Sequence, residues 1–229
     1  MYVDKMLERF GYVVRTNCPI TAVTRRTEHV ELRLRSGKSE RFDHVIFACH
    51  SDQALKILGE GATPTERDLL TAFPYERNVA QLHTDVSVLP RCRRAWASWN
   101  YFAPLQNADK ATVTYNMNIL QGIQSNDVFC VTLNGEDRVD PAKVLRRIVY
   151  SHPVFTTRRT EAQRRHLELI NLNRTSFCGA YWGNGFHEDG VNSALAACRS
   201  LESPNKQCQE TTRSSVANNR RNAAPVGLS

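Results

Sequence analysis

The sequence predicts a mixed α/β (α+β) fold, and three of its features support that class. The continuous apolar run from Val45 to Cys49 is typical of a strand that is buried on both faces. A glycine-rich junction follows Phe177 and leads into an Ala- and Leu-containing stretch, which predicts a strand, a turn and the start of a helix. Short apolar segments separated by turn residues lie between them and predict an antiparallel sheet.

The N-terminal part predicts a helix and a small antiparallel meander. Four apolar residues share one helical face between Tyr2 and Phe10: Val3, Met6, Leu7 and Phe10. We therefore expect a short helix there. Extended segments are predicted at residues 12–15, 20–23, 30–34 and 42–48.

Two helices are expected next. Ser51 and Asp52 can cap a helix from Gln53 to Leu58. The run Thr63-Pro64-Thr65-Glu66 has proline at the first helical position and glutamate where a capping box needs it. That second helix should run to about Ala72.

The middle of the chain predicts the antiparallel sheet. Its apolar and aromatic segments are residues 79–83, 95–101, 111–115 and 128–133, with turns that include residues 107–109. Trp96, Trp99 and Tyr101 mix parity along one expected strand, so they should not all face one side. They form either an aromatic wall or ordinary sheet packing. The polar residues of this region that could line a pocket are His83 and Asn100.

The remaining segments before the glycine junction are predicted from local pattern. Residues 141–147 predict a helix and residues 149–152 a strand. Residues 160–172 predict a charged helix, and Arg164, Arg165 and His166 should form its solvated face.

Composition narrows the functional classes. The 229 residues are 41% hydrophobic, which is enough for a packed core. A formal charge of +7 arises from 30 basic and 23 acidic residues that are mixed along the chain. Because no arginine-rich arm or aromatic-interleaved patch occurs, a nucleic-acid-binding protein rests on net charge alone, and no nucleic-acid partner is expected.

Cysteine usage and hydropathy predict a cytoplasmic protein. Seven cysteines are scattered without a Cys-x-x-Cys pair, which favours reduced thiols inside a cell. No apolar run approaches the length of a membrane span, and the N-terminus lacks a signal-peptide pattern. Residues 202–229 are rich in Ser, Asn, Gln, Thr and Arg and predict a disordered tail.

The glycine junction is the strongest candidate for a binding site. Glycines at 183, 185 and 190 would let a ligand approach the backbone closely. The helix that follows would direct N–H groups and a positive dipole end at a flat, polar, negatively charged group. A phosphate or the pyrimidine edge of a reduced flavin fits that description. The alternative is an ordinary strand-to-helix connection in which the glycines satisfy turn dihedrals.

Three stretches resemble a known family. They are Phe177-Cys178-Gly179-Ala180-Tyr181-Trp182-Gly183-Asn184-Gly185-Phe186-His187-Glu188-Asp189-Gly190 and its continuation to Leu201, residues 42–55, and residues 94–101. In this order they are similar to the flavin-containing amine oxidase and protoporphyrinogen oxidase superfamily, in its branch of NAD/FAD-binding amine-oxidase-like proteins. The resemblance covers residues 1–201.

The resemblance implies a fold and a domain order. The fold is the second half of an FAD/NAD(P)-binding Rossmann-like domain with an inserted antiparallel-sheet substrate domain. Residues 1–60 would belong to the FAD-binding domain and residues 61–172 to the substrate domain. Residues 173–201 would form the C-terminal flavin-binding strand, turn and helix, and residues 202–229 the tail.

The resemblance also implies a flavin-dependent oxidoreductase. FAD would accept a hydride from a small-molecule substrate, and the sheet of the substrate domain would carry the substrate-facing wall. No catalytic residue is identified. The implied cofactor-binding residues are Gly179, Tyr181, Trp182, Gly183, Gly185, Phe186, His187, Glu188, Asp189, Gly190 and Val191. Glu188 and Asp189 would act through their backbone at the helix start.

Two departures from the family pattern matter. The Gly-x-Gly-x-x-Gly motif that cradles the FAD pyrophosphate is absent from the sequence. We therefore interpret the chain as the C-terminal half of a flavoprotein: a fragment, a mis-started gene, or a split one whose N-terminal FAD-binding half is a separate partner. The alternative is a non-catalytic remnant or interaction module that binds no FAD alone. Many members also place an acidic residue after the strand-ending glycine, where this chain has Ala180.

Two other chemistries are weaker interpretations. His187, Glu188 and Asp189 are all possible metal ligands, but three consecutive residues rarely converge on one ion, so no metal is expected. Cys49 and His50 could suggest a Cys–His nucleophile, but neighbours on a strand point to opposite faces.

Overall fold

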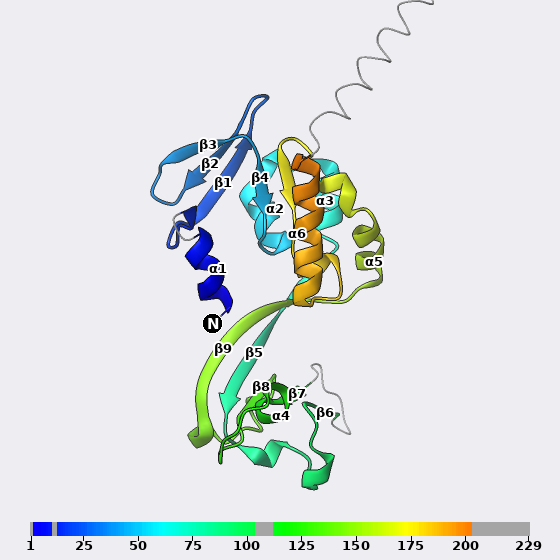
Figure 1. Cartoon of the computed structure of the whole chain (residues 1–229). Coiled ribbons are helices and arrows are strands. Elements are labelled where there is room, and N and C mark those ends of the chain that lie inside the picture. The colour runs from blue at the N-terminus through cyan, green and yellow to red at the C-terminus, as the bar shows by residue number, and fades with distance from the viewer. Residues whose placement is uncertain (1, 11–12, 104–111, 203–229) are drawn as a thin grey trace, which may run out of the picture. The chain divides into compact units, whose positions relative to one another are not determined.

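The computed structural model describes residues 2–10, 13–103 and 112–202. The chain divides into two compact units. The first unit comprises Met1–Phe73 and Phe155–Ser229, and the inserted unit comprises Pro74–Val154. The predicted tail, apart from Glu202, and the predicted turn at residues 107–109 lie outside the described residues. Mixed helices and sheets confirm the predicted fold class (Figure 1).

The first unit begins with helix α1 (Tyr2–Phe10) and an antiparallel meander, as predicted. Its strands are β1 (Ile20–Arg25), β2 (Val30–Leu34) and β3 (Ser39–Phe42), in the order β1-β2-β3. A strand was expected at residues 12–15, but residues 13–15, its described part, do not form a β-strand. The strand expected over residues 42–48 is interrupted, because β3 ends at Phe42 and the chain then leaves the meander before the next strand begins at Val45.

A two-stranded parallel sheet connects distant parts of this unit. Strand β4 (Val45–Phe47) pairs with β10 (Thr175–Phe177), and the rings of Phe47 and Phe177 stack with centroids 5.0 Å apart. Every residue of β10 is buried. Burial of β4 on both faces was predicted wrongly, because the side chain of Ile46 is 37% exposed.

Two short helices follow β4. Helix α2 (Ser51–Leu58) is capped at His50 without a side-chain hydrogen bond, so the predicted cap by Ser51 and Asp52 is wrong. A 3-10 turn, η2 (Gly59–Gly61), leads to α3 (Pro64–Leu70). The predicted capping box is confirmed, since Thr63 and Glu66 exchange side-chain and backbone hydrogen bonds.

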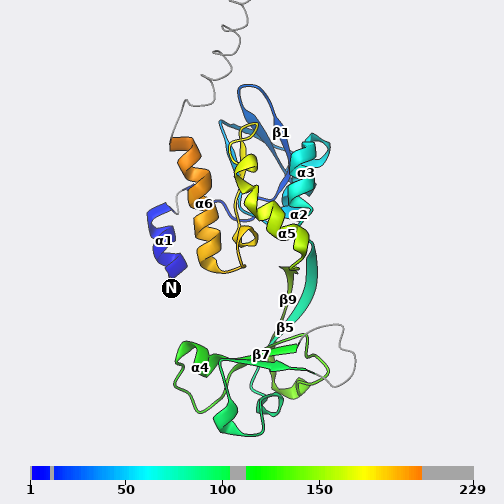
Figure 2. The ribbon, with the colours of Figure 1, turned by 90° about the vertical axis from the view of Figure 1, so that its right-hand side faces the viewer.

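The C-terminal part of the first unit completes its core. It consists of α5 (Thr157–Arg164), the 3-10 turns η6 (His166–Leu169) and η7 (Ala180–Trp182), and α6 (His187–Glu202). Leu169 and Ala197 are fully buried. Figure 2 shows α6 towards one side of this unit and α3 towards the other. Helix α6 packs against β10, whereas Ile46 on β4 stays exposed.

The inserted unit is an antiparallel sheet in the order β6-β7-β8-β5-β9. Its strands are β5 (Tyr75–His83), β6 (Trp99–Phe102), β7 (Thr112–Asn116), β8 (Cys130–Leu133) and β9 (Val144–Pro153). Its short helices are η3 (Val86–Val88), η4 (Arg93–Ala95), α4 (Met117–Gln121) and η5 (Pro141–Lys143). The helix predicted over residues 141–147 is wrong, because Val144 already pairs with β5.

The two faces of this sheet differ in an unexpected way. One face buries polar side chains, with Gln81, His83 and Thr132 fully inaccessible. On the opposite face, Trp99 is 58% and Tyr101 67% exposed. These two rings share a face because they lie two residues apart on β6, and Trp96, which disturbed the predicted parity, lies outside that strand.

Candidate functional site

The glycine turn (Gly179–Phe186) begins where the parallel sheet ends. The Cys178 N–H donates to the Phe47 carbonyl at 2.8 Å, which extends the pairing of β10 by one residue. At Gly179 a Cβ atom would lie 2.5 Å from Cε1 of Tyr181. Glycine is therefore required at this strand end, and the chain turns towards α6 at the carboxyl edge of the sheet.

Tyr181 and Trp182 lie in the core of the first unit. They are 4% and 8% exposed, and the ring of Phe73 meets theirs at centroid distances of 4.9 and 5.1 Å. His166 stacks on Trp182 at 4.2 Å and its Nε2 lies 2.7 Å from the Phe177 carbonyl. Burial lowers the pKa of His166. The prediction that His166 is solvated is therefore wrong. Tyr181 and Trp182 anchor the glycine turn in the core of the first unit.

The Asp189 carboxylate organises the turn. Its Oδ2 accepts hydrogen bonds from the N–H groups of Asn184 and Phe186, each at 2.9 Å. A Cβ at Gly183 would lie 2.6 Å from Cβ of Asp189, so this glycine makes room for the carboxylate. The side chain of Asp189, and not only its backbone, therefore has a role. Its engagement also argues against the metal interpretation, and no group of potential metal ligands occurs in the described part of the chain.

Two residues of α5 hold the turn from the side. Arg159 and Gln163 both donate to the Gly183 carbonyl, and Gln163 Nε2 also lies 2.9 Å from the Tyr181 carbonyl. Arg159 is 3% exposed. Burial lowers the pKa of its guanidinium, while the nearby Asp189 charge acts in the opposite direction. Sequence reasoning missed both residues, because nothing local links α5 to a turn some twenty residues later.

The exposed part of the turn keeps donors available. Among the described residues, no hydrogen-bond partner engages the N–H groups of Ala180, His187 or Glu188. Gly185 has a φ of 93°, and a Cβ there would meet no atom within 4 Å. Phe186 is 60% exposed. The open arc from Gly185 to Glu188 at the start of α6 can therefore accept a polar group with negative charge.

Other predicted positions are less suited to direct contact with a ligand. At Gly190 a Cβ would be an ordinary 3.8 Å from the Ala180 nitrogen, so packing does not require glycine. Val191 is 53% exposed on the side of α6.

A cavity of about 200 Å³ adjoins the turn between His166, Asp189 and Asn192. It is smaller than usual small-molecule pockets.

The Cys–His interpretation loses support. Burial raises the pKa of the Cys49 thiol, and the Asp52 carboxylate raises it further. A nucleophilic cysteine needs the opposite shift, because the thiolate is the reactive form.

The side chains of His83 and Asn100 are engaged within the inserted unit. The His83 ring is fully buried, with Nε2 2.7 Å from the Thr132 hydroxyl. The Asn100 amide bonds the backbone of Ala97 and Thr114. Both side chains therefore serve the inserted unit itself.

Comparison with known proteins supports the flavoprotein interpretation. Residues 1–84 match the family model of flavin containing amine oxidoreductases. This match confirms the resemblance to flavin-containing amine oxidases over residues 1–84. No curated protein matches the chain. In the described residues, no helix has the length and apolar character needed to cross a membrane.

Solved structures support the fold. A protein from Exiguobacterium sp. 255-15, assigned as a protoporphyrinogen oxidase, superposes with a TM-score of 0.52 at 14% identity, over 87% of this chain and 51% of that one. A fatty acid isomerase from P. acnes gives a TM-score of 0.54 at 11% identity, over 82% and 48%. A triple mutant of putrescine oxidase gives 0.57 at 10% identity, over 87% and 52%. The chain thus spans about half the length of these structures.

Proposed function

We propose that this chain supplies the flavin edge of an FAD-dependent oxidoreductase of amine-oxidase type. The observation that carries the proposal is the open arc from Gly185 to Glu188, where the glycine turn leaves unpaired N–H groups at the start of α6. It lies at the carboxyl edge of two parallel strands, where α/β folds bind their ligands. The family match to residues 1–84 supports the same assignment.

The residues present suit the pyrimidine edge of a flavin. Bound FAD would supply the chemistry of hydride acceptance. The N–H groups of His187 and Glu188 would meet its carbonyl oxygens, and the positive end of α6 would favour negative charge there. Asp189 takes no direct part, because its carboxylate already accepts the N–H groups of Asn184 and Phe186.

Neighbouring side chains would keep the arc in position. Arg159 and Gln163 fix the Gly183 carbonyl, and the Ser193 hydroxyl accepts the Gly179 N–H at 2.9 Å. Because Ser193 also bonds the Gly190 carbonyl at 2.8 Å, the strand end and the first turn of α6 are joined. A site built on such fixed elements would hold the cofactor more tightly than a free loop.

A pyrophosphate-binding motif on another polypeptide segment would strengthen this binding. Ile46 is exposed although parallel strands are normally covered on both faces, so β4 offers an uncovered apolar face against which such a segment would pack. The same observation favours the second candidate function, an interaction module that binds no FAD alone. Retention of FAD by the purified chain distinguishes the two.

The substrate would be a small molecule with an apolar body, such as an amine or another CH–NH or CH–CH donor. On the inserted sheet, Trp99 and Tyr101 present a half-exposed aromatic surface, and the Trp99 ring meets Tyr115 edge-on at 5.2 Å. An apolar substrate would gain from covering these rings. This surface is our candidate for the substrate wall.

The first test is an absorbance spectrum of the purified chain after incubation with FAD and desalting. We expect a retained flavin band close to one equivalent. A folded chain without bound flavin would assign the binding activity elsewhere and favour the interaction module. Adding a polypeptide that carries a strand, Gly-x-Gly-x-x-Gly and helix would then show whether a second half restores retention.

Two matched variants locate the flavin. Gly185→Asn adds a side chain to the open arc, and Asn tolerates positive φ better than other residues. Gly122→Asn makes the same change at φ 65° in the inserted unit, where a Cβ also meets nothing within 4 Å. We expect Gly185→Asn to weaken FAD binding about tenfold or more and Gly122→Asn to leave it unchanged. Equal behaviour of the two variants would place the flavin elsewhere.

A further inference from the structure

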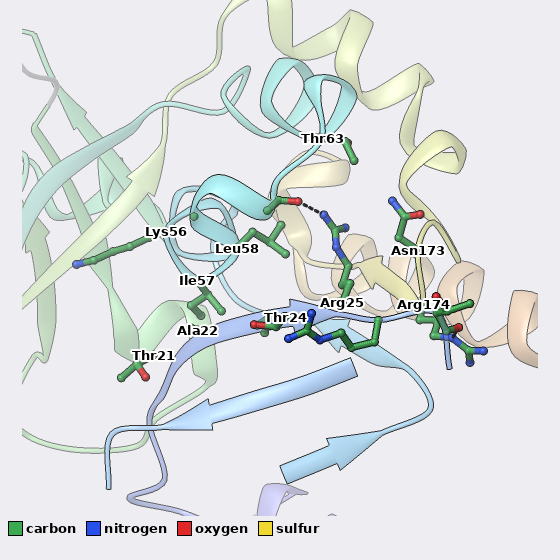
Figure 3. A pocket seen from close by; sticks show the side chains of 15 residues that line it. Thr21, Ala22, Thr24, Arg25, Lys56, Ile57, Leu58, Thr63, Asn173 and Arg174 are labelled. Carbon is green, nitrogen blue, oxygen red and sulfur yellow. Dashed lines mark hydrogen bonds between the residues drawn. The ribbon is translucent and has the colours of Figure 1, made fainter. Parts of the chain in front are cut away.

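A groove of about 720 Å³ lies in the first unit, away from the glycine turn. One wall is β1 with the turn after it, and the other is the last turn of α2 with η2. Figure 3 shows Thr21 and Lys56 towards one end and Asn173 and Arg174 towards the other. Its volume falls in the usual range for small-molecule pockets.

The groove is separate from the candidate flavin edge. Asn173 and Arg174 directly precede β10, whereas the glycine turn directly follows it. The two sites therefore lie at opposite ends of the parallel strands, about 10 Å of strand apart. A ligand in the groove would not occupy the arc from Gly185 to Glu188.

The charges along the groove have one sign. Four cationic side chains line it and no acidic one does: Arg25, Arg26, Lys56 and Arg174. Between them the lining mixes threonines with apolar residues, of which Ala22 and Ile57 are partly exposed. The strand from Thr21 to Arg25 is about 13 Å long. The groove thus offers a middle of mixed polarity and positive charge along its length.

Two of the cations build the walls. Arg25 forms an ion pair with the fully buried Glu66 and also donates to Gly61 and Thr175. Arg174 donates to the Thr27 carbonyl at 2.7 Å, although its backbone is held at a φ of 61°. Such a conformation costs about 1–2 kcal/mol in a residue with a side chain and persists only where its surroundings enforce it. The walls are therefore fixed before any ligand arrives.

The other two cations are available. Within the described ranges, no hydrogen bond or ion pair engages the side chain of Arg26 or Lys56. A cation near the C-terminus of α2 can cap the helix by donating to its last carbonyl groups, as Arg67 does to the Gly59 carbonyl at 2.7 Å. Arg26 makes no such bond, so helix capping does not explain it.

We propose that this groove binds a small elongated anion, a molecule with phosphate or carboxylate groups and an apolar body. Arg26 and Lys56 would pair with its negative groups, and Ala22 and Ile57 would contact its body. This site is independent of the proposed flavin chemistry. It uses none of the residues assigned to the cofactor.

The test is isothermal titration calorimetry of the full chain at low ionic strength. The probes are inorganic pyrophosphate and a linear dicarboxylate, octanedioate, which separate a phosphate from a carboxylate preference. The variant Arg26→Gln/Lys56→Gln should weaken binding about tenfold for each lost charged contact. Neither side chain makes a contact that folding needs.

A matched control separates the groove from the overall positive charge. Arg41→Gln/Lys38→Gln removes the same charge from exposed meander positions outside the groove. We expect the control to bind within about twofold of the unchanged chain. Saturable binding lost only in the groove variant supports the proposal. No saturable binding of either probe, or equal weakening in both variants, overturns it.

Discussion

The two compact units bury polar groups of different kinds. In the first unit, the buried polar groups that hold segments together include charges, above all the ion pair between Arg25 and Glu66. In the inserted unit, neutral groups do so: the Thr132 hydroxyl lies 2.7 Å from His83 Nε2 and 2.8 Å from the Thr114 hydroxyl. The exception is Asp85, whose carboxylate accepts the N–H groups of Ser87 and Asp140.

The difference follows from what each set of bonds connects. Arg25 joins β1 to α3 and to β10, which are distant in the sequence, and a guanidinium with several donors can reach all of them. The Thr132 network instead lies across neighbouring strands, where strand pairing already places short side chains face to face. Loss of a charged anchor should therefore affect stability more than loss of a hydroxyl.

Glu66→Ala should have the largest effect. It removes the partner of buried Arg25 and half of the capping box of α3, so we expect a loss of about 3–5 kcal/mol in the free energy of unfolding of the first unit. Urea denaturation followed by the fluorescence of Trp182 in a Trp96→Phe/Trp99→Phe background reports on this unit, because the chain has 3 tryptophans.

The matched control for Glu66 is Glu60→Ala. Glu60 carries the same charge on η2 but is exposed, so its loss should change stability by about 0.5 kcal/mol or less. Similar effects of the two substitutions would show that the Arg25–Glu66 pair does not anchor the unit.

Thr132→Val tests the neutral network. The valine keeps the shape but leaves His83 and Thr114 without their shared partner, which we expect to cost about 2–3 kcal/mol in the inserted unit. Thr132→Ser keeps the hydroxyl and should cost about 1 kcal/mol for the lost methyl group. Hydrogen–deuterium exchange of β8 measures both. A serine variant as unstable as the valine would assign the effect to packing instead of hydrogen bonding.

Much of the fold was predictable because its signals are local. The pattern of apolar residues identified strands β1 and β2 of the meander but not β3, and the sequence around Thr63 identified the start of α3 with its capping box. Residues 141–147 were misjudged, since helix propensity there gives way to pairing of Val144 with β5, a tertiary effect. The exposure of Ile46 was missed for the same reason, because burial depends on neighbours.

The candidate site was only partly predictable. The glycines and the start of α6 could be located from the sequence, because turns and helix starts have local signatures. The sequence offered no signal that Arg159 and Gln163 would bond the Gly183 carbonyl, or that His166 would stack on Trp182. Such contacts depend on how α5 packs. The cofactor-binding residues and the domain boundaries named from the resemblance stay predictions.

A pH dependence should separate the units further. Burial lowers the pKa of His83 below the ordinary value of 6.5, while the pKa of Asp85 is also lowered, so its carboxylate stays charged. Below pH 6.5 His83 binds a proton more readily in the unfolded chain than in the folded chain. The contribution of neutral His83 to the stability of the inserted unit is therefore fully present above that pH and is lost as the pH falls towards the folded pKa of His83.

Exchange rates of β5 and β8 measured between pH 7.5 and 5, corrected for intrinsic exchange, test this dependence. The inserted unit should lose protection as the pH falls, and His83→Gln should remove most of that loss. Burial also lowers the pKa of His44 and His166 in the first unit, so a whole-chain melting curve would not assign the effect. Unchanged pH dependence in the His83 variant would contradict the assignment.

Tyr101→Ala should have the smallest effect, although it removes a whole ring. Tyr101 is 67% exposed on the face opposite Thr132, so we expect a change in stability of about 0.5 kcal/mol or less. Thr132→Val, which replaces one hydroxyl by a methyl group, should cost several times more. A loss above about 1 kcal/mol in Tyr101→Ala, measured by exchange of β6 and β7, would show that the aromatic face is covered in solution. The rings would then be less available to a substrate, because apolar surface that is already covered in the folded chain gains nothing from substrate binding.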